Sequence, residues 1–350
     1  FTTQVLKYEH MCCKIKLRQG DYMRKIRRKR EKVKKKIIII SAFLFLIIMT
    51  SGYAAFSTNI SLHAKGNIKI KPVDIGGIEV LPVTEGDGLY EDENESGRYV
   101  YRGSNPNNYI MFNNELWRII SKETDGTYKI LRNEVLPEKK VFDSPGARTT
   151  GYCSKGSAPN NGCNVWSSTA SMIGSPSEFT NGTYTGTVDA DSEMLTYLNG
   201  EYLNSITANK DKITSHDYNI GAAILGNNNL SAQIEGEKAY KWNGNIGLIS
   251  MSEYLNANSN QEQCGTELNY DNNYTTCKNN DWMFIENSWW TLTPYASYSN
   301  YVWNVGSIGD LNLGNENADA YYCVRPAIYL TSNLSLSGSG SESNPYKIVS

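Results

Sequence analysis

The sequence has few of the residues on which enzyme active sites are most often built. Only three of its 350 residues are histidine, namely His10, His63 and His216. Neither of the two that follow the N-terminal segment, His63 and His216, has an obvious serine or cysteine partner. A nucleophile with an adjacent base is therefore hard to assemble. The motifs G-x-S-x-G and H-E-x-x-H and a phosphate-binding loop are also missing. We therefore expect no enzyme and no cofactor. Paired carboxylates of the glycosidase type stay open as an alternative, because they meet only in the fold.

Charged residues are also scarce, at 20% of the chain, and they are unevenly distributed. Residues 1–36 contain 14 Lys and Arg and 3 Asp and Glu, which leaves 20 basic and 33 acidic residues in the remainder. The remainder thus has a net charge of −13. Because phosphate binding requires a basic surface, we expect no nucleic acid among the partners. The abundance of Asn, Gly, Ser, Thr and Tyr is instead typical of bacterial exported β-rich proteins.

The N-terminal part of the chain predicts a membrane segment. Residues 1–22 precede Met23 and are treated as a doubtful extension, and residues 23–36 form a basic cytoplasmic segment. Residues 37–56 are apolar over 20 residues, enough to cross about 30 Å of hydrocarbon. They predict a transmembrane or signal-anchor helix, with the C-terminal body outside the bacterial cell membrane. A cleavable signal peptide is the alternative, and it would make the protein secreted.

The next segment, 57–97, predicts an extended β-rich stalk or linker. Its apolar residues alternate loosely, and residues 85–95 are acidic with several glycines, which is typical of a solvated linker. A Ca²⁺ site in 85–95 is a competing interpretation, because hard cations prefer clustered oxygens. The spacing matches no EF-hand loop, however, and we expect no metal.

Residues 98–331 predict one α+β domain, followed by a C-terminal hairpin at 332–350. Hairpin signals lie at Asn113-Asn114 and Asp125-Gly126, between apolar segments rich in β-formers. Helical signals are clearest within 189–214, and a further short helix is expected at 250–256.

Four cysteines predict two disulfides. Cys153 and Cys163 enclose one polar loop, and Cys264 and Cys277 enclose another. In an exported protein such local pairs indicate Cys153–Cys163 and Cys264–Cys277, with Cys323 free. Other pairings stay open on sequence alone. A zinc site is disfavoured, because neither pair is a C-x-x-C and no histidine lies nearby.

The stretch 288–330 has apolar ends and a middle rich in Tyr, Asn and Ser. Tyrosine supplies rigid contact area and Asn and Ser supply adaptable hydrogen bonding, so this composition predicts a ligand-binding surface. A solvated hairpin without a function is the alternative. The predicted contacts are Tyr295, Ser297, Tyr298, Asn300, Tyr301, Trp303, Asn304, Asp310, Asn312, Asn315, Asn317 and Tyr321. Trp303 alternates with Val302 and is equally suited to the core.

Several motifs occur in a characteristic order. They are Leu116-Trp117-Arg118-Ile119-Ile120, Tyr197-Leu198-Asn199-Gly200, Ile246–Ser250, Trp289-Trp290-x-Leu-x-Pro, Trp303-Asn304-Val305 and Val324–Leu330. In this order they resemble a family of bacterial secreted and surface domains of unknown function with a C-type-lectin-like fold. That fold is related to the formylglycine-generating enzymes and to the variable proteins of diversity-generating retroelements. The resemblance implies an α+β domain with short antiparallel strands and two or three short helices.

Together these features predict an extracellular, membrane-anchored, adhesin-like or receptor-like protein that binds a glycan or a protein. The composition of 295–323 also fits a surface diversified through adenine-rich codons, as in the retroelement-variable proteins. Residues 53–70 are similar to the start of camelysin-like and biofilm-matrix proteins. That similarity supports the alternative of a structural envelope or biofilm-matrix component without a specific ligand.

Overall fold

The computed structural model describes residues 70–168, 190–223, 230–265, 274–296, 298–312 and 316–349. All of them belong to one compact unit, Ile70–Ser350. The predicted extension, basic segment and membrane segment, which together span 1–56, lie outside the described residues. Within the described part of the chain, no helix is long and apolar enough to cross a membrane.

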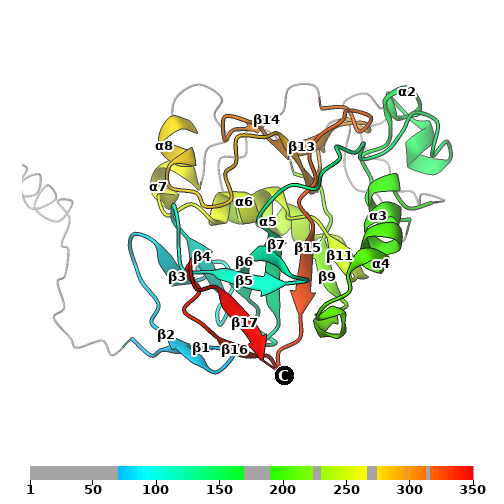
Figure 1. The fold of residues 1–350 in the computed structure, drawn as a ribbon. Coiled ribbons are helices and arrows are strands. Elements are labelled where there is room, and N and C mark those ends of the chain that lie inside the picture. The colour runs from blue at the N-terminus through cyan, green and yellow to red at the C-terminus, as the bar shows by residue number, and fades with distance from the viewer. Residues whose placement is uncertain are drawn as a thin grey trace, which may run out of the picture. The chain divides into compact units, whose positions relative to one another are not determined.

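The largest sheet among the described residues has ten strands and is curled (Figure 1). Its path runs through β11 (Ile246–Gly247), β15 (Ala327–Leu330), β7 (Tyr128–Arg132), β6 (Glu115–Lys122), β5 (Tyr109–Phe112), β17 (Tyr346–Val349) and β16 (Ser335–Ser337). Three further strands join it at the side: β3 (Gly88–Glu91), β4 (Tyr99–Arg102) and β8 (Ile213–Thr214). Its strand pairs are antiparallel except for β5 and β17, which run parallel.

Two predicted turns connect the middle of this sheet. Asn113 and Asn114 join β5 to β6 with φ of 52° and 60°, the left-handed conformation that a two-residue hairpin turn requires. Gly126 has φ of 87° in the connection from β6 to β7, and the Asp125 carboxylate accepts from the Thr127 N–H there. Both hairpin predictions are confirmed.

Three smaller sheets and a set of short helices complete the described fold. The sheets pair β1 (Val73–Ile75) with β2 (Ile78–Val80), β9 (His216–Asn219) with β10 (Lys241–Gly244), and β12 (Trp289–Pro294) with β13 (Val302–Val305) and then β14 (Leu311–Asn312). The α-helices are α2 (Ala158–Asn161), α3 (Glu193–Tyr197), α4 (Leu203–Ser205), α5 (Leu230–Lys238), α6 (Met251–Asn256), α7 (Gln261–Cys264) and α8 (Tyr274–Lys278). A π-helical turn, η2 (Leu198–Tyr202), links α3 to α4, and 3-10 turns occur at η1 (Gly151–Ser154) and η3 (Lys210–Lys212).

Serine side chains fix where two of these helices begin. Ser192 accepts a hydrogen bond from the Leu195 N–H at the start of α3. Ser250 and Glu253 form a reciprocal capping box at the start of α6. These bonds satisfy N–H groups that have no partner inside the helix.

The middle of the ten-stranded sheet is buried on both faces, whereas the strands β16 and β17 alternate between buried and more exposed residues. Neighbouring residues of the same strand, such as Ile119 and Ile120 or Ile130 and Leu131, belong to two different hydrophobic clusters. Because successive side chains of a strand point to opposite faces, each face has its own core. This explains why the central strands are continuous apolar runs instead of alternating ones.

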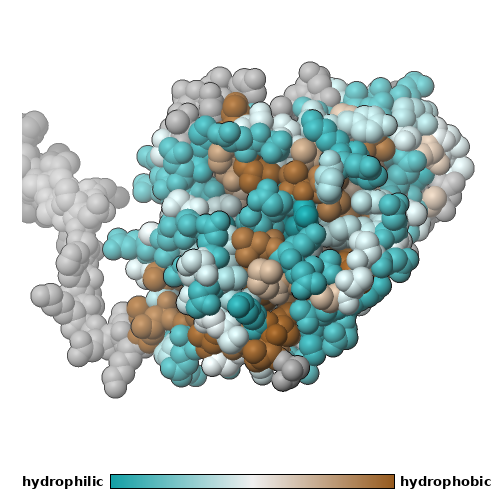
Figure 2. All heavy atoms as spheres, in the orientation of Figure 1, coloured by the Kyte–Doolittle hydropathy of each residue, from teal (hydrophilic) through white to brown (hydrophobic). Residues whose placement is uncertain are grey.

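Hydrophobic residues also reach the surface of the described unit. Figure 2 shows them gathered in the lower part of the view, near β1, β2, β16 and β17. Exposed hydrophobic residues include Leu81, which directly follows β2 and is 62% exposed, and Val349 of β17.

These observations correct the predicted fold class. The structure is a mixed α/β arrangement around a curled sheet that contains a parallel strand pair, and not the predicted α+β domain of short antiparallel strands. No helix among the described residues is of a kind to cross a membrane, and the predicted membrane segment lies outside them. The sequence pattern missed the parallel pair because β5 and β17 are more than 230 residues apart, so no local turn signals their pairing. Residues 70–97, which were assigned to the linker, supply β3 to the main sheet, and the segment 332–350 forms the β16–β17 hairpin.

Both predicted disulfides are formed. The Cα atoms of Cys153 and Cys163 are 5.4 Å apart, and those of Cys264 and Cys277 are 5.5 Å apart. Both distances are usual for a disulfide. Cys323 is free and buried.

Candidate functional site

The predicted binding stretch is built on β12 and β13. All six residues of β12 are buried, and so are the four residues of β13. Trp289, Trp290 and Trp303 fill the space on both sides of this strand pair. The hydroxyl of Thr291 donates to the carbonyl of Trp303 at 2.7 Å, so the polar atom of this buried threonine has a partner. The pair therefore forms a rigid base for the loop between its strands.

That loop carries three tyrosines, Tyr295, Tyr298 and Tyr301, which we call the tyrosine surface. The rings of Tyr298 and Tyr301 are 4.9 Å apart between centroids, and the ring of Tyr295 lies 5.9 Å from that of Tyr298. Tyr298 is 38% exposed, and the other two are partly exposed. Stacked rings of this kind offer flat apolar area and hydroxyl groups to a ligand.

A buried asparagine holds the tyrosine surface in place. The side-chain amide of Asn164 donates to the carbonyls of Tyr298, Tyr301 and Tyr295 at 2.7, 2.9 and 3.2 Å. In addition, the Asn164 N–H donates to the carbonyl of Ser299 at 2.9 Å. Asn164 directly follows Cys163, so the disulfide-closed loop 153–163 anchors the segment that supports the tyrosines. The backbone of the surface is thus fixed before a ligand binds.

The structure divides the twelve predicted contacts into three groups. Exposed or partly exposed are Tyr295, Tyr298, Tyr301, Asp310, Asn317 and Tyr321, the last at 69%. Ser297 and Asn315 lie outside the described residues, as does the side chain of Asn312. Buried are Asn300, Trp303 and Asn304.

The three buried residues correct the predicted contact set. Trp303 and Asn304 belong to β13, which is the middle strand of its sheet and is paired on both sides. The ring of Trp303 packs edge-on against Tyr295. Asn300 donates to the side chain of Asn317 and is 2% exposed. In this structure these three side chains are not accessible from the surface.

Sequence reasoning missed a second feature, a polar cavity of about 400 Å³. It lies where the β3–β4 turn, the β6–β7 turn, β9, β10, α5 and α6 converge. No residue of the tyrosine surface lines it. Its lining includes Arg98, Glu123, His216 and Glu253, which are distant in the sequence.

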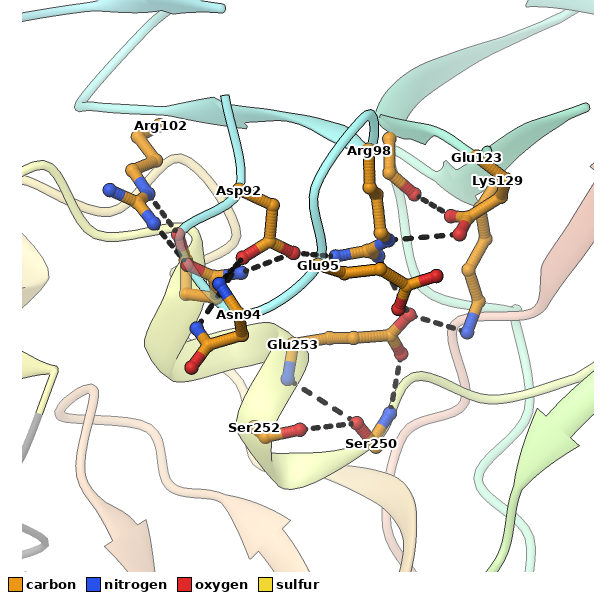
Figure 3. A network of polar contacts seen from close by, with 12 residues as sticks. Asp92, Asn94, Glu95, Arg98, Arg102, Glu123, Lys129, Ser250, Ser252 and Glu253 are labelled. Atoms are coloured by element: carbon orange, nitrogen blue, oxygen red, sulfur yellow. Dashed lines mark hydrogen bonds and ion pairs between the residues drawn. The ribbon is translucent and has the colours of Figure 1, made fainter. Parts of the chain in front are cut away.

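A network of ion pairs forms one wall of this cavity (Figure 3). Arg98 pairs with Asp92 at 2.5 Å and with Glu123 at 2.9 Å. Lys129 of β7 pairs with Glu253 of α6 at 2.6 Å. Figure 3 shows the Arg98 side chain directed between the two carboxylates of Asp92 and Glu123. The network therefore joins the sheet to α6.

The network shifts the ionisation of its members. Burial alone would raise the pKa of Asp92 and of Glu123, but the Arg98 guanidinium outweighs burial and holds both pKa values below their usual range. The same carboxylates raise the pKa of Arg98. All three groups are therefore charged at neutral pH.

Behind this wall, Glu237 of α5 is fully buried without a cationic partner. It accepts hydrogen bonds from the Thr293 hydroxyl at 2.8 Å and from both the hydroxyl and the N–H of Ser252. Burial raises the pKa of Glu237 to about 7, although these hydrogen bonds oppose the rise.

His216 also lines the cavity, and its ring is stacked on that of Tyr329 with centroids 3.9 Å apart. Its Nε2 lies 3.3 Å from Asp125, and its Nδ1 lies 3.2 Å from the Asp217 carbonyl. Both ring nitrogens thus have partners other than a nucleophile. Within the described ranges, no group of three or more His, Cys, Asp or Glu is placed to hold a metal ion.

Comparison with known proteins gives one match. A family profile described as a domain of unknown function (DUF6273) matches residues 175–332, which is less than half of the chain. The matched segment contains β12, β13, the tyrosine surface and α6, whereas Arg98, Glu123 and Lys129 precede it. No curated protein and no solved structure matches the chain.

Proposed function

We propose that the protein is an extracellular binding protein that recognises a glycan or a protein through the tyrosine surface. The observation that carries this proposal is the set of three hydrogen bonds by which Asn164 holds the tyrosine-bearing loop. A surface that is already ordered loses less conformational entropy when a ligand binds. Tyrosine also supplies large contact area at a low entropic cost.

The disulfides support an extracellular location. Four of the five described cysteines form two disulfides, and such bonds persist in oxidising compartments. The part of the chain after residue 36 is acidic, so a nucleic acid is not among the ligands that we propose.

A ligand array tests the proposal. The purified protein is applied to immobilised glycans and to immobilised cell-surface proteins, and each hit is compared with the variants Tyr298→Ala and Tyr301→Ala. We expect both variants to weaken binding about tenfold or more, because aromatic anchors dominate such interfaces. Leu81→Ala is the matched control, since Leu81 is exposed on a different part of the unit and its removal leaves the tyrosine surface intact.

Two outcomes would contradict the proposal. In the first, ligands are captured but the tyrosine variants bind them as well as Leu81→Ala does, which would show that another surface binds the ligand. In the second, nothing on the array binds while the protein forms fibres as its concentration rises, which would favour a structural envelope or matrix role.

A further inference from the structure

The polar cavity is separate from the tyrosine surface, because no residue of that surface lines it. Its volume of about 400 Å³ falls in the range of small-molecule sites. It is formed by segments that the ion pairs Arg98–Glu123 and Lys129–Glu253 hold together, so its shape is set by the fold and not by one loop. A small ligand, and not a protein surface, therefore fits this cavity.

The lining of the cavity selects against apolar ligands. Among its lining residues, only Ile234 has a purely aliphatic side chain, and the others carry hydroxyl, amide, charged or aromatic polar groups. An apolar molecule would remove these groups from water without giving them hydrogen bonds, which costs free energy. The ligand must therefore be polar over most of its surface.

The charges of the lining further define the ligand. Six carboxylates and three permanent cations line the cavity. Each of the cations already has an acidic partner: Arg98 has Asp92 and Glu123, Lys238 lies 3.2 Å from Glu95, and Lys241 lies 3.7 Å from Asp217. The cavity thus has an excess of negative charge, and ionised carboxylates only accept hydrogen bonds. A ligand that donates hydrogen bonds and carries a positive charge complements it.

Two of these carboxylates are the most open to the solvent. The side chains of Asp125 and Asp217 are about half-exposed, at 54% and 46%. Asp125 lies 3.3 Å from Nε2 of His216, whose imidazole is stacked on Tyr329, whereas the carboxylate of Asp217 accepts from the Asn243 amide at 2.9 Å. Charged acceptors beside a flat ring suit a sugar ring that bears an ammonium group.

We propose that this cavity binds an amino sugar, meaning a small polyhydroxylated ring with a free primary ammonium group. Its hydroxyl groups donate to the carboxylates and to the Asn and Ser oxygens of the lining. Its ammonium group is attracted by the negative charge of the lining, to which the half-exposed Asp125 and Asp217 contribute. This site is independent of the tyrosine surface and of whatever ligand that surface binds.

Calorimetric titration of the purified protein with three sugars at pH 7 tests the inference. The probes are glucosamine, glucose, which lacks the ammonium group, and N-acetylglucosamine, in which the nitrogen is acylated and uncharged. We expect glucosamine to bind about tenfold more tightly than the other two, because a hydrogen bond to a charged group contributes more than a neutral one. Equal binding of the three sugars, or no binding of glucosamine, overturns the inference.

Variants of residues that line the cavity locate the sugar site and distinguish it from the tyrosine surface. Asp217→Asn and Asp125→Asn remove one charge each at half-exposed positions, and we expect each to weaken glucosamine binding about tenfold. Asp211→Asn is the matched control, because Asp211 is exposed, pairs with Lys212 and lies outside the cavity. An equal loss in Asp211→Asn would show that overall charge, and not this cavity, attracts the sugar.

The tyrosine variants complete the design. Tyr298→Ala leaves the cavity intact, so it should bind glucosamine as the unchanged protein does, even if the ligand array gives no hit. Loss of glucosamine binding in Tyr298→Ala would locate the sugar at the tyrosine surface and overturn the assignment to the cavity.

Discussion

The side-chain amide of Asn164 lies 2.7 Å from the carbonyl of Tyr298 and donates a hydrogen bond to it. Asn164 is fully buried and directly follows Cys163, whereas Tyr298 is among the exposed large side chains of the described unit. A buried residue beside a disulfide thus fixes the backbone of an exposed aromatic residue more than 130 positions later in the chain. The order of the tyrosine surface therefore depends on a segment that has no binding role of its own.

The first prediction follows from this bond. Asn164→Leu keeps the branched shape of the side chain but removes the amide that donates to three carbonyls, of which that of Tyr301 retains the Tyr295 N–H as a donor. We therefore expect the free energy of unfolding to fall by roughly 2–4 kcal/mol. Urea denaturation measures this change. We also expect the variant to lose affinity for any ligand of the tyrosine surface.

Asn258→Leu is the matched control for Asn164→Leu. Asn258 is also buried, and its amide donates to the Cys277 carbonyl at 2.6 Å beside the other disulfide. It should lower stability without changing binding at the tyrosine surface. If the two variants affect binding equally, the loss comes from general destabilisation and Asn164 has no special role.

The second prediction concerns the disulfides. Replacing Cys153 and Cys163 by serine removes a cross-link between residues ten positions apart, and we expect a loss of about 3 kcal/mol in the free energy of unfolding. Binding at the tyrosine surface should weaken as well, because loop 153–163 supports it. The corresponding double replacement of Cys264 and Cys277 should lower stability and leave that binding unchanged. Thiol labelling of the denatured, unreduced protein should modify Cys323 and none of these four, and labelling of all five would refute the pairing.

The sequence allowed the disulfides and the β5–β6 and β6–β7 hairpins to be predicted because each depends on residues close together in the chain. The Asn113-Asn114 turn is an example, since two residues determine both its conformation and the register of its strands. The tyrosines of the predicted surface were found for a similar reason, because they cluster within seven positions, 295–301.

The features that were not predicted from the sequence depend on contacts between residues far apart in the chain, which no local pattern reveals. Trp303 and Asn304 were included among the predicted contacts because of the Tyr-, Asn- and Ser-rich composition of 288–330, with the core as an equal alternative for Trp303. However, β13 is paired on both sides and buries both residues. The polar cavity draws its lining from segments between Asp92 and Tyr329. No segment by itself signals a cavity, and the acidic stretch around Asp92 was interpreted as a linker. Only the fold brings Arg98 between Asp92 and Glu123.

The third prediction concerns that ion-pair network. Arg98→Met leaves the carboxylates of Asp92 and Glu123 buried without their cation, so we expect a loss of roughly 3–5 kcal/mol in the free energy of unfolding. Arg132→Met is the control, since Arg132 pairs at 2.8 Å with Glu115, a more exposed partner, and should cost clearly less. The two variants are compared by urea denaturation at pH 7. Similar losses would mean that the network contributes no more to the free energy of unfolding than the single Arg132–Glu115 pair does.

The last prediction is a pH dependence that arises from Glu237. Burial raises its pKa to about 7 in the folded protein, whereas in the unfolded chain its pKa is near the ordinary glutamate value of about 4.3. Between these values the folded state holds a proton that the unfolded state has lost. The stabilisation is therefore complete below the unfolded pKa and is lost as pH rises through the folded pKa of about 7, by about 4 kcal/mol in total.

Urea denaturation between pH 5 and pH 8 measures this slope, and the variant Glu237→Gln isolates it. Glutamine retains a carbonyl acceptor for the Thr293 hydroxyl but does not ionise, so the variant should lose less stability than the unchanged protein over this interval. Burial raises the pKa of Asp281 to about 8, so Asp281 also makes the protein less stable as pH rises, and it does so in both proteins. The difference between the two curves therefore belongs to Glu237. Parallel curves would mean that Glu237 is already ionised at pH 5, so that its hydrogen bonds to Ser252 and Thr293 outweigh its burial.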